Sequence, residues 1–385
     1  MITKMKENKE VKLGYDDVSI VPAVISTIKS RNECNPCDEF GRLPIFVSPM
    51  DTVISEQNYA DFARNNLNIV VPRTVNLIKR IHMLFQINNF VAFSLAEAKD
   101  LFVEDNLEKY VIYETIKNGW GCKICIDLAN GHMKDLLDTV KSIKMKHPEI
   151  IIMTGNIANP KTYIEYEKAR VDYVRVGIGG GAGCLTASNT GTYMPYFSLL
   201  KEIHEERKKI DGRCKIIADG GIKGYRDIQK SLLYADYVMI GSIFNKAFES
   251  AGKTTYGKFY WVLRGYKIFR PLKTLLNYGK ELDRSKFNEL KERWKKGEFV
   301  VWKQYRGMST KAAQTAIAKA NGLTDVKLKT SEGLVKYQKV EYTLDGWVEN
   351  EIDYLKSAMS YTNSRTLEEY KESEWVRVCS ISHNK

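Results

Sequence analysis

The sequence predicts an α/β protein built as a (β/α)8 barrel, or TIM barrel. The first observation is a series of eight short runs, rich in β-branched and aromatic residues, spread over about 200 residues. The second is that most intervals between these runs have helical character. The third is that the runs are nearly continuous in apolar residues, as expected for parallel strands buried on both faces.

Eight runs meet this description: LPIFVSPM (43–50), LNIVVPR (67–73), FVAFSL (90–95), KICIDLA (123–129), EIIIMTGN (149–156), DYVRVGIG (172–179), CKIIADGG (214–221) and DYVMIGSI (236–243). MKDLLDTVKSIKMKHP (133–148) and RDIQKSLLYA (226–235) are examples of the helical intervals. Most runs carry Gly, Asp, Asn, Ser or Arg at or near the last residue. Active sites of such barrels form at the carboxyl ends of the strands, so we expect the functional residues there.

The chain of 385 residues is expected to form a single catalytic domain, 1–385. Residues 245–304 are far longer than the one helix needed after the eighth strand, and they are aromatic and basic. We therefore predict an inserted subdomain or extended surface element at 245–304.

The net charge of +12 favours anionic partners such as phosphates, although a basic surface without a dedicated partner would give the same charge. The densest basic segment, LKERWKKG (290–297), is interpreted as a solvated helix face, so no nucleic acid is expected as a partner. No apolar stretch approaches the length of a bilayer span, and the charged N-terminal segment lacks a signal-peptide pattern. We expect a cytoplasmic protein without a membrane partner.

The seven cysteines are odd in number and scattered, which argues against a disulfide framework. Two CxxC pairs, Cys34 with Cys37 and Cys122 with Cys125, could supply four zinc ligands. However, Cys122 and Cys125 begin a strand, where residues three apart point to opposite faces. A zinc site is therefore disfavoured.

Two glycine-containing strand ends predict a phosphate site. ADGG (218–221) and IGS (240–242) end the seventh and eighth strands, the usual phosphate-binding position in these barrels. Glycine amides can donate to phosphate without steric hindrance, and Asp219 could bind a ribose diol. Each motif alone could equally be a turn, but their joint position favours the phosphate site.

A glycine-rich stretch, GIGGGAGCLTASNTGT (177–192), follows the sixth strand and carries Cys184. Such a strand-to-helix loop brings the thiol to the barrel mouth, where a thiolate could attack an electrophilic carbon of a ligand. The alternative is that Cys184 is an inert, small apolar residue.

Nine segments, in order, resemble the IMP dehydrogenase and GMP reductase family: LGYDDVSIVPA (13–23), VSPMDTV (47–53), TGNIA (154–158), VGIGGGAGCLT (176–186), IIADGGIKGYRDI (216–228), VMIGSIF (238–244), YRGMSTKAA (305–313), SEGLVKYQKVEY (331–342) and SYTNSRTLEEYKE (360–372). The resemblance covers nearly the whole chain apart from 245–304. It implies a TIM barrel, a purine nucleoside monophosphate as substrate, a nicotinamide cofactor (NADPH or NAD), a monovalent cation such as K+ and a homotetramer.

The resemblance also implies residue roles. Cys184 would be the nucleophile that attacks the purine C2 and forms a covalent adduct, and Asp127, Ala129 and Asn130 would lie on the cofactor side. The backbone carbonyls of Gly179, Gly181 and Cys184 would bind the cation. The positions that would hold the mononucleotide are Ser48, Met50, Asn156, Gly183, Asp219, Gly220, Gly221, Gly241, Ser242, Tyr305, Gly307, Met308 and Ser309.

The glycine loop departs from the family pattern at two places. Where the family usually reads Gly-Pro-Gly-Ser, this chain has Gly179, Gly180, Gly181 and Ala182, so a phosphate-binding hydroxyl is missing. An arginine that commonly follows is replaced by Ala187. Both changes could weaken nucleotide binding or use of the cation.

The choice between the two family activities depends on how the adduct is resolved. A dehydrogenase hydrolyses it with an Arg-Tyr pair on a flap, here expected at 309–342, but Ser309 to Ser331 contains neither Arg nor Tyr. A reductase expels ammonia and accepts hydride from NADPH, helped by residues that correspond to Thr186 and Glu332, although dehydrogenases keep matching residues at these positions. This favours GMP reductase over IMP dehydrogenase.

Three further segments resemble reductases: IDLANGH (126–132), IKSRNECN (28–35) and WVRVCSISHNK (375–385). The short interval between the second and third strands leaves no room for the regulatory CBS module of most dehydrogenases. A third hypothesis is a purine-nucleotide-binding protein that has lost turnover.

Overall fold

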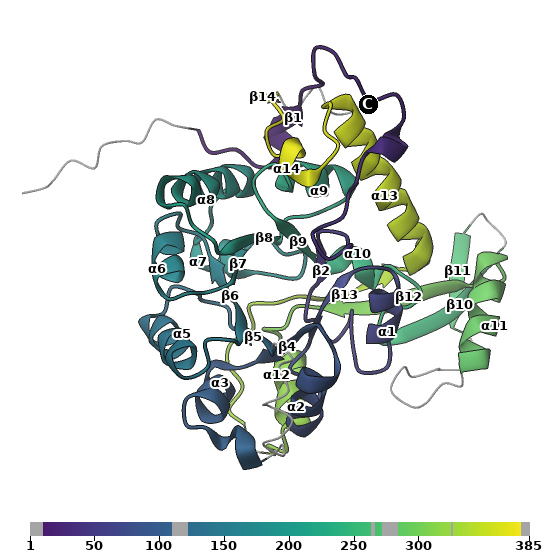
Figure 1. Cartoon of the computed structure of the whole chain (residues 1–385). Coiled ribbons are helices and arrows are strands. Elements are labelled where there is room, and N and C mark those ends of the chain that lie inside the picture. Colours follow the sequence, from purple (N-terminus) through teal and green to yellow (C-terminus); the bar gives the residue numbers. More distant parts are fainter. Residues whose placement is uncertain (1–10, 110–121, 263–265, 272–283, 325, 379–385) are drawn as a thin grey trace, which may run out of the picture.

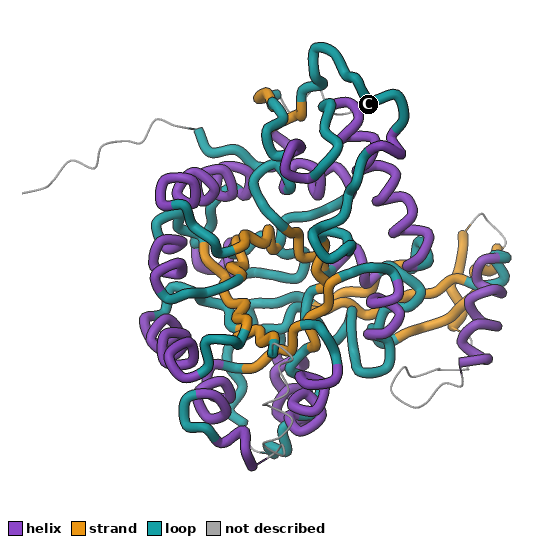
Figure 2. Tube along the Cα trace, in the orientation of Figure 1, coloured by secondary structure: helices purple, strands orange, loops and turns teal. Residues whose placement is uncertain are grey.

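The computed structural model describes residues 11–109, 122–262, 266–271, 284–324 and 326–378. Eight parallel strands form a closed barrel in the order in which they occur in the chain, and β9 pairs with β2 to complete the ring. Figure 2 shows this ring of strands with helices around it. The strands are β2 (Ile45–Val47), β3 (Asn68–Val71), β4 (Phe90–Phe93), β5 (Lys123–Asp127), β6 (Ile151–Ile157), β7 (Tyr173–Val176), β8 (Lys215–Asp219) and β9 (Tyr237–Ile240). The predicted fold class is confirmed, and each strand lies within or one residue beyond its predicted run.

Helices lie between successive barrel strands in the chain or after the last of them, and most of them surround the ring (Figure 1). They are α1 (Tyr59–Arg64), α2 (Leu77–Gln86), α3 (Leu95–Phe102), α5 (Lys134–Lys146), α6 (Thr162–Lys168), α7 (Thr186–Thr190), α8 (Tyr196–Ile210), α9 (Tyr225–Ser231), α10 (Ser242–Asn245) and α13 (Leu344–Tyr361). Short 3-10 turns occur at Tyr15–Asp17, Arg31–Glu33 and Asn106–Lys109. No helix in the described part of the chain is both long enough and apolar enough to span a bilayer.

The strands are apolar on both faces because each face has its own core. In β5, Ile124 and Ile126 pack into the large cluster between the strands and the helices. Cys125, between them, packs inside the barrel with Met153 and Ile217. Cys122 belongs to the outer cluster, so these two cysteines do lie on opposite faces of the sheet. Among the described residues, no three His, Cys, Asp or Glu side chains gather as metal ligands would.

A second sheet stands beside the barrel (Figure 1). It is antiparallel, with the strand order β11 (Tyr266–Pro271), β10 (Thr254–Val262), β12 (Val300–Arg306) and β13 (Val335–Lys339). The helix α11 (Arg284–Lys295) precedes β12, and a small core that includes Phe248, Phe287 and Val340 lies under this region. The sheet therefore joins residues of the predicted insertion, 245–304, to residues of the predicted flap, 309–342.

The two ends of the described chain meet in a small two-stranded sheet. The strand β1 (Val18–Ile20) pairs in antiparallel register with β14 (Trp375–Arg377), which follows α14 (Leu367–Tyr370). Trp375 packs edge-on against Phe197 of α8, with ring centroids 4.8 Å apart. This contact fixes the terminal sheet against the outer layer of the barrel.

Candidate active site

The loop between β7 and α7 is rich in glycine for a steric reason that the sequence analysis missed. The ring of Tyr196, at the start of α8, packs against the backbone of this loop, and its hydroxyl accepts the amide of Gly180 at 3.1 Å. A Cβ at Gly177 would lie 2.2 Å from the Tyr196 ring, and a Cβ at Gly180 would lie 2.3 Å from it. The absence of side chains at these positions leaves room for a buried aromatic ring under the loop.

We expect Gly180→Ala to destabilise the protein by roughly 1–3 kcal/mol, because the new methyl group would overlap a buried ring that has little room to move. Thermal unfolding would measure the loss. Gly181→Ala is the matched control, since a Cβ there would meet only the Cβ of Cys184, at an ordinary 3.6 Å. Equal unfolding midpoints for the two variants would contradict the role of Tyr196.

Cys184 lies at the end of this loop and begins a chain of polar contacts. Its thiol donates to Thr186 Oγ1 at 3.3 Å, and the Thr186 hydroxyl donates to Glu332 Oε2 at 2.7 Å. All three side chains are only partly buried, so a ligand can reach them. The predicted catalytic residues therefore lie together, although 146 positions separate Thr186 from Glu332.

Backbone pairing brings Glu332 to the loop. Leu185 N donates to the Glu332 carbonyl at 2.7 Å, and Leu334 N donates to the Gly183 carbonyl at 3.0 Å. These bonds make a short antiparallel bridge between Cys184 and Gly333. Main-chain hydrogen bonds therefore hold Glu332 beside Thr186 and Cys184.

A second group of predicted residues gathers at the ends of β2, β9 and β12. Ser48 N donates to the Ile240 carbonyl at 2.9 Å, and the Tyr305 hydroxyl lies 3.6 Å from Met50 Sδ. A Cβ at Gly241 would lie 2.7 Å from Met50 Sδ, and 3.5 Å from the Ser48 Cβ. Ser48, Met50, Gly241 and Tyr305 thus form one wall of the barrel mouth.

The same wall continues to the glycine loop. A Cβ at Gly183 would lie 2.9 Å from the Tyr305 ring, and a Cβ at Gly307 would lie 2.5 Å from the Gly183 carbonyl oxygen. Met308 and Ser309 follow directly in the chain, and Ser242 begins α10. The close approach of these backbones requires glycine at both positions.

Asp219 and Asn156 meet on the opposite side of the loop. Asn156 Nδ2 donates to Asp219 Oδ2 at 2.8 Å and to the Gly177 carbonyl at 2.9 Å. The hydrogen bonds and the ion pair that the described residues make to the Asp219 carboxylate all end on Oδ2, which leaves Oδ1 able to accept from a ligand. Gly220 and Gly221 follow Asp219 with φ of 111° and 74°, in the left-handed region that favours glycine.

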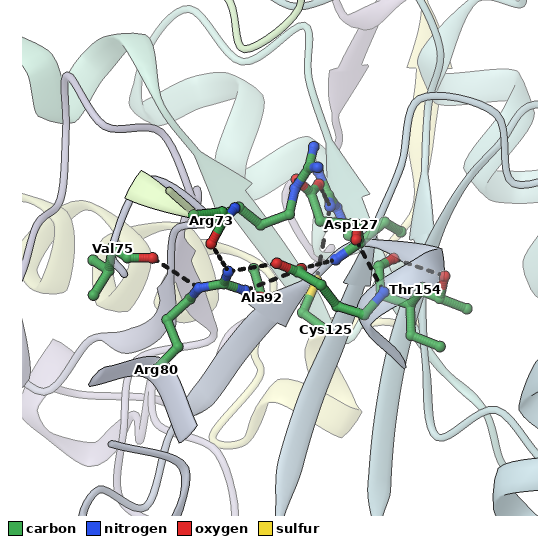
Figure 3. Close-up of polar contacts among 12 residues, drawn as sticks. Arg73, Val75, Arg80, Ala92, Cys125, Asp127 and Thr154 are labelled. Atoms are coloured by element: carbon green, nitrogen blue, oxygen red, sulfur yellow. Dashed lines mark hydrogen bonds and ion pairs between the residues drawn. The ribbon is translucent and has the colours of Figure 1, made fainter. Parts of the chain in front are cut away.

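Arg175 joins the two carboxylates that the sequence analysis assigned to different ligands, and the sequence analysis did not identify it. Its guanidinium donates to Asp219 Oδ2 at 2.9 Å and to Asp127 Oδ1 at 2.7 Å. Arg73, after β3, donates to Asp127 Oδ2 at 3.0 Å (Figure 3). The sequence did contain a signal for the role of Arg175, because an arginine within the largely apolar strand DYVRV (172–176) needs a charged partner.

The two arginines set the charge of Asp127. Burial raises the pKa of this carboxyl, but Arg73 and Arg175 beside it outweigh burial and hold the pKa below its usual range. Ala129 and Asn130 follow on an exposed loop, where Asn130 Oδ1 accepts the amide of His132 at 3.0 Å. The predicted cofactor side therefore combines an ionised carboxylate with an open rim.

The three carbonyl groups assigned to a monovalent cation lie within one short segment of the glycine loop. The carbonyl of Gly181 accepts the amide of Cys184 at 2.9 Å, which closes a turn. Carbonyl oxygens are suitable donors for K+. A cation at Gly179, Gly181 and Cys184 stays a prediction.

The helix α12 (Lys311–Ala320), in the predicted flap, is docked on α2. Asn76 Nδ2 donates to the Ala320 carbonyl at 2.9 Å, and Arg80 Nη2 donates to Asn321 Oδ1 at 3.1 Å. Arg80 is fully buried and also donates to the carbonyls of Val75 and Ala92, at 2.8 and 2.7 Å (Figure 3). These contacts hold the flap helix against the barrel.

A family model described as "IMP dehydrogenase / GMP reductase domain" matches residues 12–281 of the chain. The chain therefore belongs to the IMP dehydrogenase / GMP reductase family. This match confirms the predicted relationship and covers all eight barrel strands, the glycine loop and Cys184.

Curated members of this family carry both names. The chain is 33% identical to the inosine-5'-monophosphate dehydrogenase of Chlorobaculum tepidum over 259 residues, which are 67% of this chain and 45% of that protein. It is 33% identical to the GMP reductase of Staphylococcus saprophyticus over 249 residues, which are 62% of this chain and 72% of that protein. A GMP reductase of Streptococcus gordonii is 32% identical over 252 residues, 62% of this chain and 72% of that enzyme. The match thus spans less than half of the dehydrogenase and most of each reductase, at similar identity.

Proposed function

We propose that this chain is a purine nucleotide oxidoreductase and specifically a GMP reductase, which converts GMP, NADPH and a proton into IMP, ammonia and NADP+. The observation that carries the proposal is the contact chain from Cys184 through Thr186 to Glu332. It combines a nucleophile with a hydroxyl and a carboxyl that can move a proton, as expulsion of an amine requires.

In this mechanism the Cys184 thiolate attacks C2 of the purine and forms a carbon–sulfur bond, while the electrons of the C2–N3 π bond move to N3. Expulsion of a group from C2 later restores that π bond. The 2-amino group leaves as ammonia after it receives a proton, which the Thr186 and Glu332 pair delivers across the 2.7 Å hydrogen bond between them. NADPH, when bound, supplies the hydride that C2 receives in its place. Departure of the Cys184 thiolate then releases IMP and restores the free enzyme.

The mononucleotide would be held by the residues that line the barrel mouth. Asp219 Oδ1 would accept from a ribose hydroxyl, while Asn156 and Arg175 hold the other oxygen of the carboxylate. The Gly221 amide donates to the Gly180 carbonyl at 3.0 Å, so the backbone amides of Gly220, Gly241 and Ser242 would donate to the phosphate. Ionised Asp127 and the exposed Ala129 and Asn130 would face NADPH, and the protein would assemble as a homotetramer.

We expect GMP to bind about 10- to 100-fold more tightly than guanosine, because charge-assisted hydrogen bonds to phosphate contribute about 1.5–3 kcal/mol. Isothermal titration calorimetry with both ligands would measure the difference. Equal affinities would contradict a phosphate site at the ends of β8 and β9.

IMP dehydrogenase is the second candidate, since relatives of similar identity carry that name. It would oxidise IMP with NAD to XMP, which requires an activated water. The flap segment from Ser309 to Ser331 contains no Arg or Tyr for that task. A nucleotide-binding protein without turnover is the third candidate, suggested by the altered glycine loop.

The purified protein should therefore be assayed with GMP and NADPH and, separately, with IMP and NAD. Consumption of NADPH with stoichiometric IMP and ammonia supports the reductase. XMP formation from IMP supports the dehydrogenase, and the absence of both reactions together with tight mononucleotide binding supports the third candidate.

A further inference from the structure

A cavity of about 210 Å³ lies at the end of the barrel opposite the candidate active site. Its position follows from the strands, because Asn68, Phe90, Lys123, Tyr173 and Tyr237 line it and each is the first residue of its strand. Cys184 and Asp219, by contrast, lie at or after the carboxyl ends of β7 and β8. The cavity is therefore separated from the catalytic residues by the interior of the barrel.

The floor of this cavity is aromatic. The ring centroid of Phe46 lies 5.7 Å from that of Phe90 and 5.1 Å from that of Tyr237, with the rings edge to face. Tyr173 completes the group, at 5.2 Å from Phe90 and 5.8 Å from Tyr237. Four packed rings thus close this end of the barrel and line the cavity, so that a planar ligand there would lie against aromatic side chains.

Two cations, Arg42 and Lys123, line the same cavity. The Arg42 guanidinium donates to neutral oxygens: Asn68 Oδ1 at 3.3 Å, Asn89 Oδ1 at 3.1 Å and the Asn88 carbonyl at 3.4 Å. The Lys123 ammonium lies 5.7 Å from the centroid of the Phe40 ring. No carboxylate of the described residues forms an ion pair with either cation.

Asp38, an acid close enough to act on Lys123, already accepts hydrogen bonds from other groups. Its Oδ1 accepts the backbone amides of Phe40 and Arg42, both at 2.9 Å, and its Oδ2 accepts the Tyr237 hydroxyl at 3.1 Å. Burial and the neighbouring Arg42 hold the pKa of Lys123 below its usual range, and Asp38 only partly opposes them. A bound anion would relieve this repulsion between the two cations.

We infer that this cavity binds a small aromatic carboxylate. An apolar cavity of about 150 Å³ is large enough to hold benzene, so 210 Å³ has room for one ring and a carboxylate. The ring would pack on Phe46, Phe90 and Tyr173. The carboxylate would contact Arg42 and Lys123, because a guanidinium matches the planar geometry of a carboxylate. The inference does not depend on the proposed reductase activity.

Three probes separate the contributions of ring and charge. Benzoate carries both, benzyl alcohol carries the ring alone, and inorganic phosphate carries the charge alone. We expect benzoate to bind the full chain at least about tenfold more tightly than either of the other probes, as measured by calorimetry or ligand-observed NMR. Comparable affinity for all three would overturn the inference.

Variants then locate the site. Lys123→Met and Arg42→Gln should each weaken benzoate binding at least about tenfold. Lys215→Met is the matched control, because Lys215 is likewise the first residue of a barrel strand but lies outside this cavity. Benzoate affinity that Lys123→Met leaves unchanged, or that Lys215→Met lowers equally, would overturn the site. If a variant does not fold, the probe series on the unaltered chain still decides the outcome.

Discussion

Cys184→Ala should lower turnover of GMP by about 10⁴-fold or more, the scale seen when a nucleophile is removed from an enzyme that works through a covalent intermediate. The variant should still bind GMP with nearly unchanged affinity. The reason is that the nucleotide would be held by other side chains, namely Ser48, Asn156, Asp219 and Tyr305. In the described part of the chain, the side-chain hydrogen bond of Cys184 goes to Thr186 and to none of these four. Steady-state NADPH oxidation and GMP titration measure the two properties.

The matched control is Cys37→Ala, since Cys37 is also partly buried but precedes β2, away from the glycine loop. It should retain full turnover. Mass spectrometry of the unaltered protein, quenched during turnover, should show a nucleotide adduct that Cys184→Ala lacks. Retained turnover in Cys184→Ala would exclude the covalent mechanism.

Much of the barrel could be predicted because parallel strands leave a strong local signal. A strand such as β5 must be apolar on both faces, since Ile124 and Ile126 pack against helices while Cys125 packs inside. The residues that follow the strands, such as Cys184 and Gly241, were correspondingly placed at one end. The need for apolar side chains on both faces of a strand concerns only the residues of that strand, so a short stretch of sequence is enough to reveal it.

The residues that the sequence analysis missed act through contacts between distant segments. Tyr196 appeared only as part of an amphipathic helix, yet its ring lies against Gly177 and Gly180 and explains their lack of side chains. Arg175 on β7 links Asp127 at the end of β5 to Asp219 at the end of β8, so the contact spans four neighbouring strands of the barrel. Neither contact produces a periodic pattern in the sequence, because both depend on how strands and loops pack in three dimensions.

The second sheet was not predicted for the same reason, since most of its strands pair across long distances in the sequence. The length and composition of residues 245–304 predicted an insertion there. No pattern within these residues indicated that β10 pairs with β12 and β12 with β13. The consequence for the site is direct, because Tyr305 lies in β12 and Glu332 lies three residues before β13. Two predicted functional residues therefore depend on pairing that the sequence alone did not predict.

Glu332→Gln should lower the rate of GMP-dependent NADPH oxidation by about 10²–10⁴-fold, the usual contribution of a positioned proton donor or acceptor. Glutamine keeps the size of the side chain and can still accept the Thr186 hydroxyl, but it cannot exchange a proton with it. The affinity for GMP should change little, so kcat and kcat/KM should fall together, as expected when an interaction is lost only in the transition state.

Two comparisons make this result specific. Glu349→Gln, an exposed position on α13, should retain the rate of the unaltered protein. Thr186→Ser should retain most of the rate because it keeps the hydroxyl between Cys184 and Glu332, whereas Thr186→Val should lose rate as Glu332→Gln does. A rate insensitive to both Glu332→Gln and Thr186→Val would exclude this pair as the proton path.

The same variant also distinguishes the two family reactions. Ammonia must leave as the amine is protonated, so release of ammonia and oxidation of NADPH should fall in parallel in Glu332→Gln. Formation of XMP from IMP and NAD needs a base that removes a proton from water, and the segment from Ser309 to Ser331 contains no Arg or Tyr to serve as one. Rapid XMP formation would therefore mean that the base comes from outside this segment, and the chain would then act as an IMP dehydrogenase.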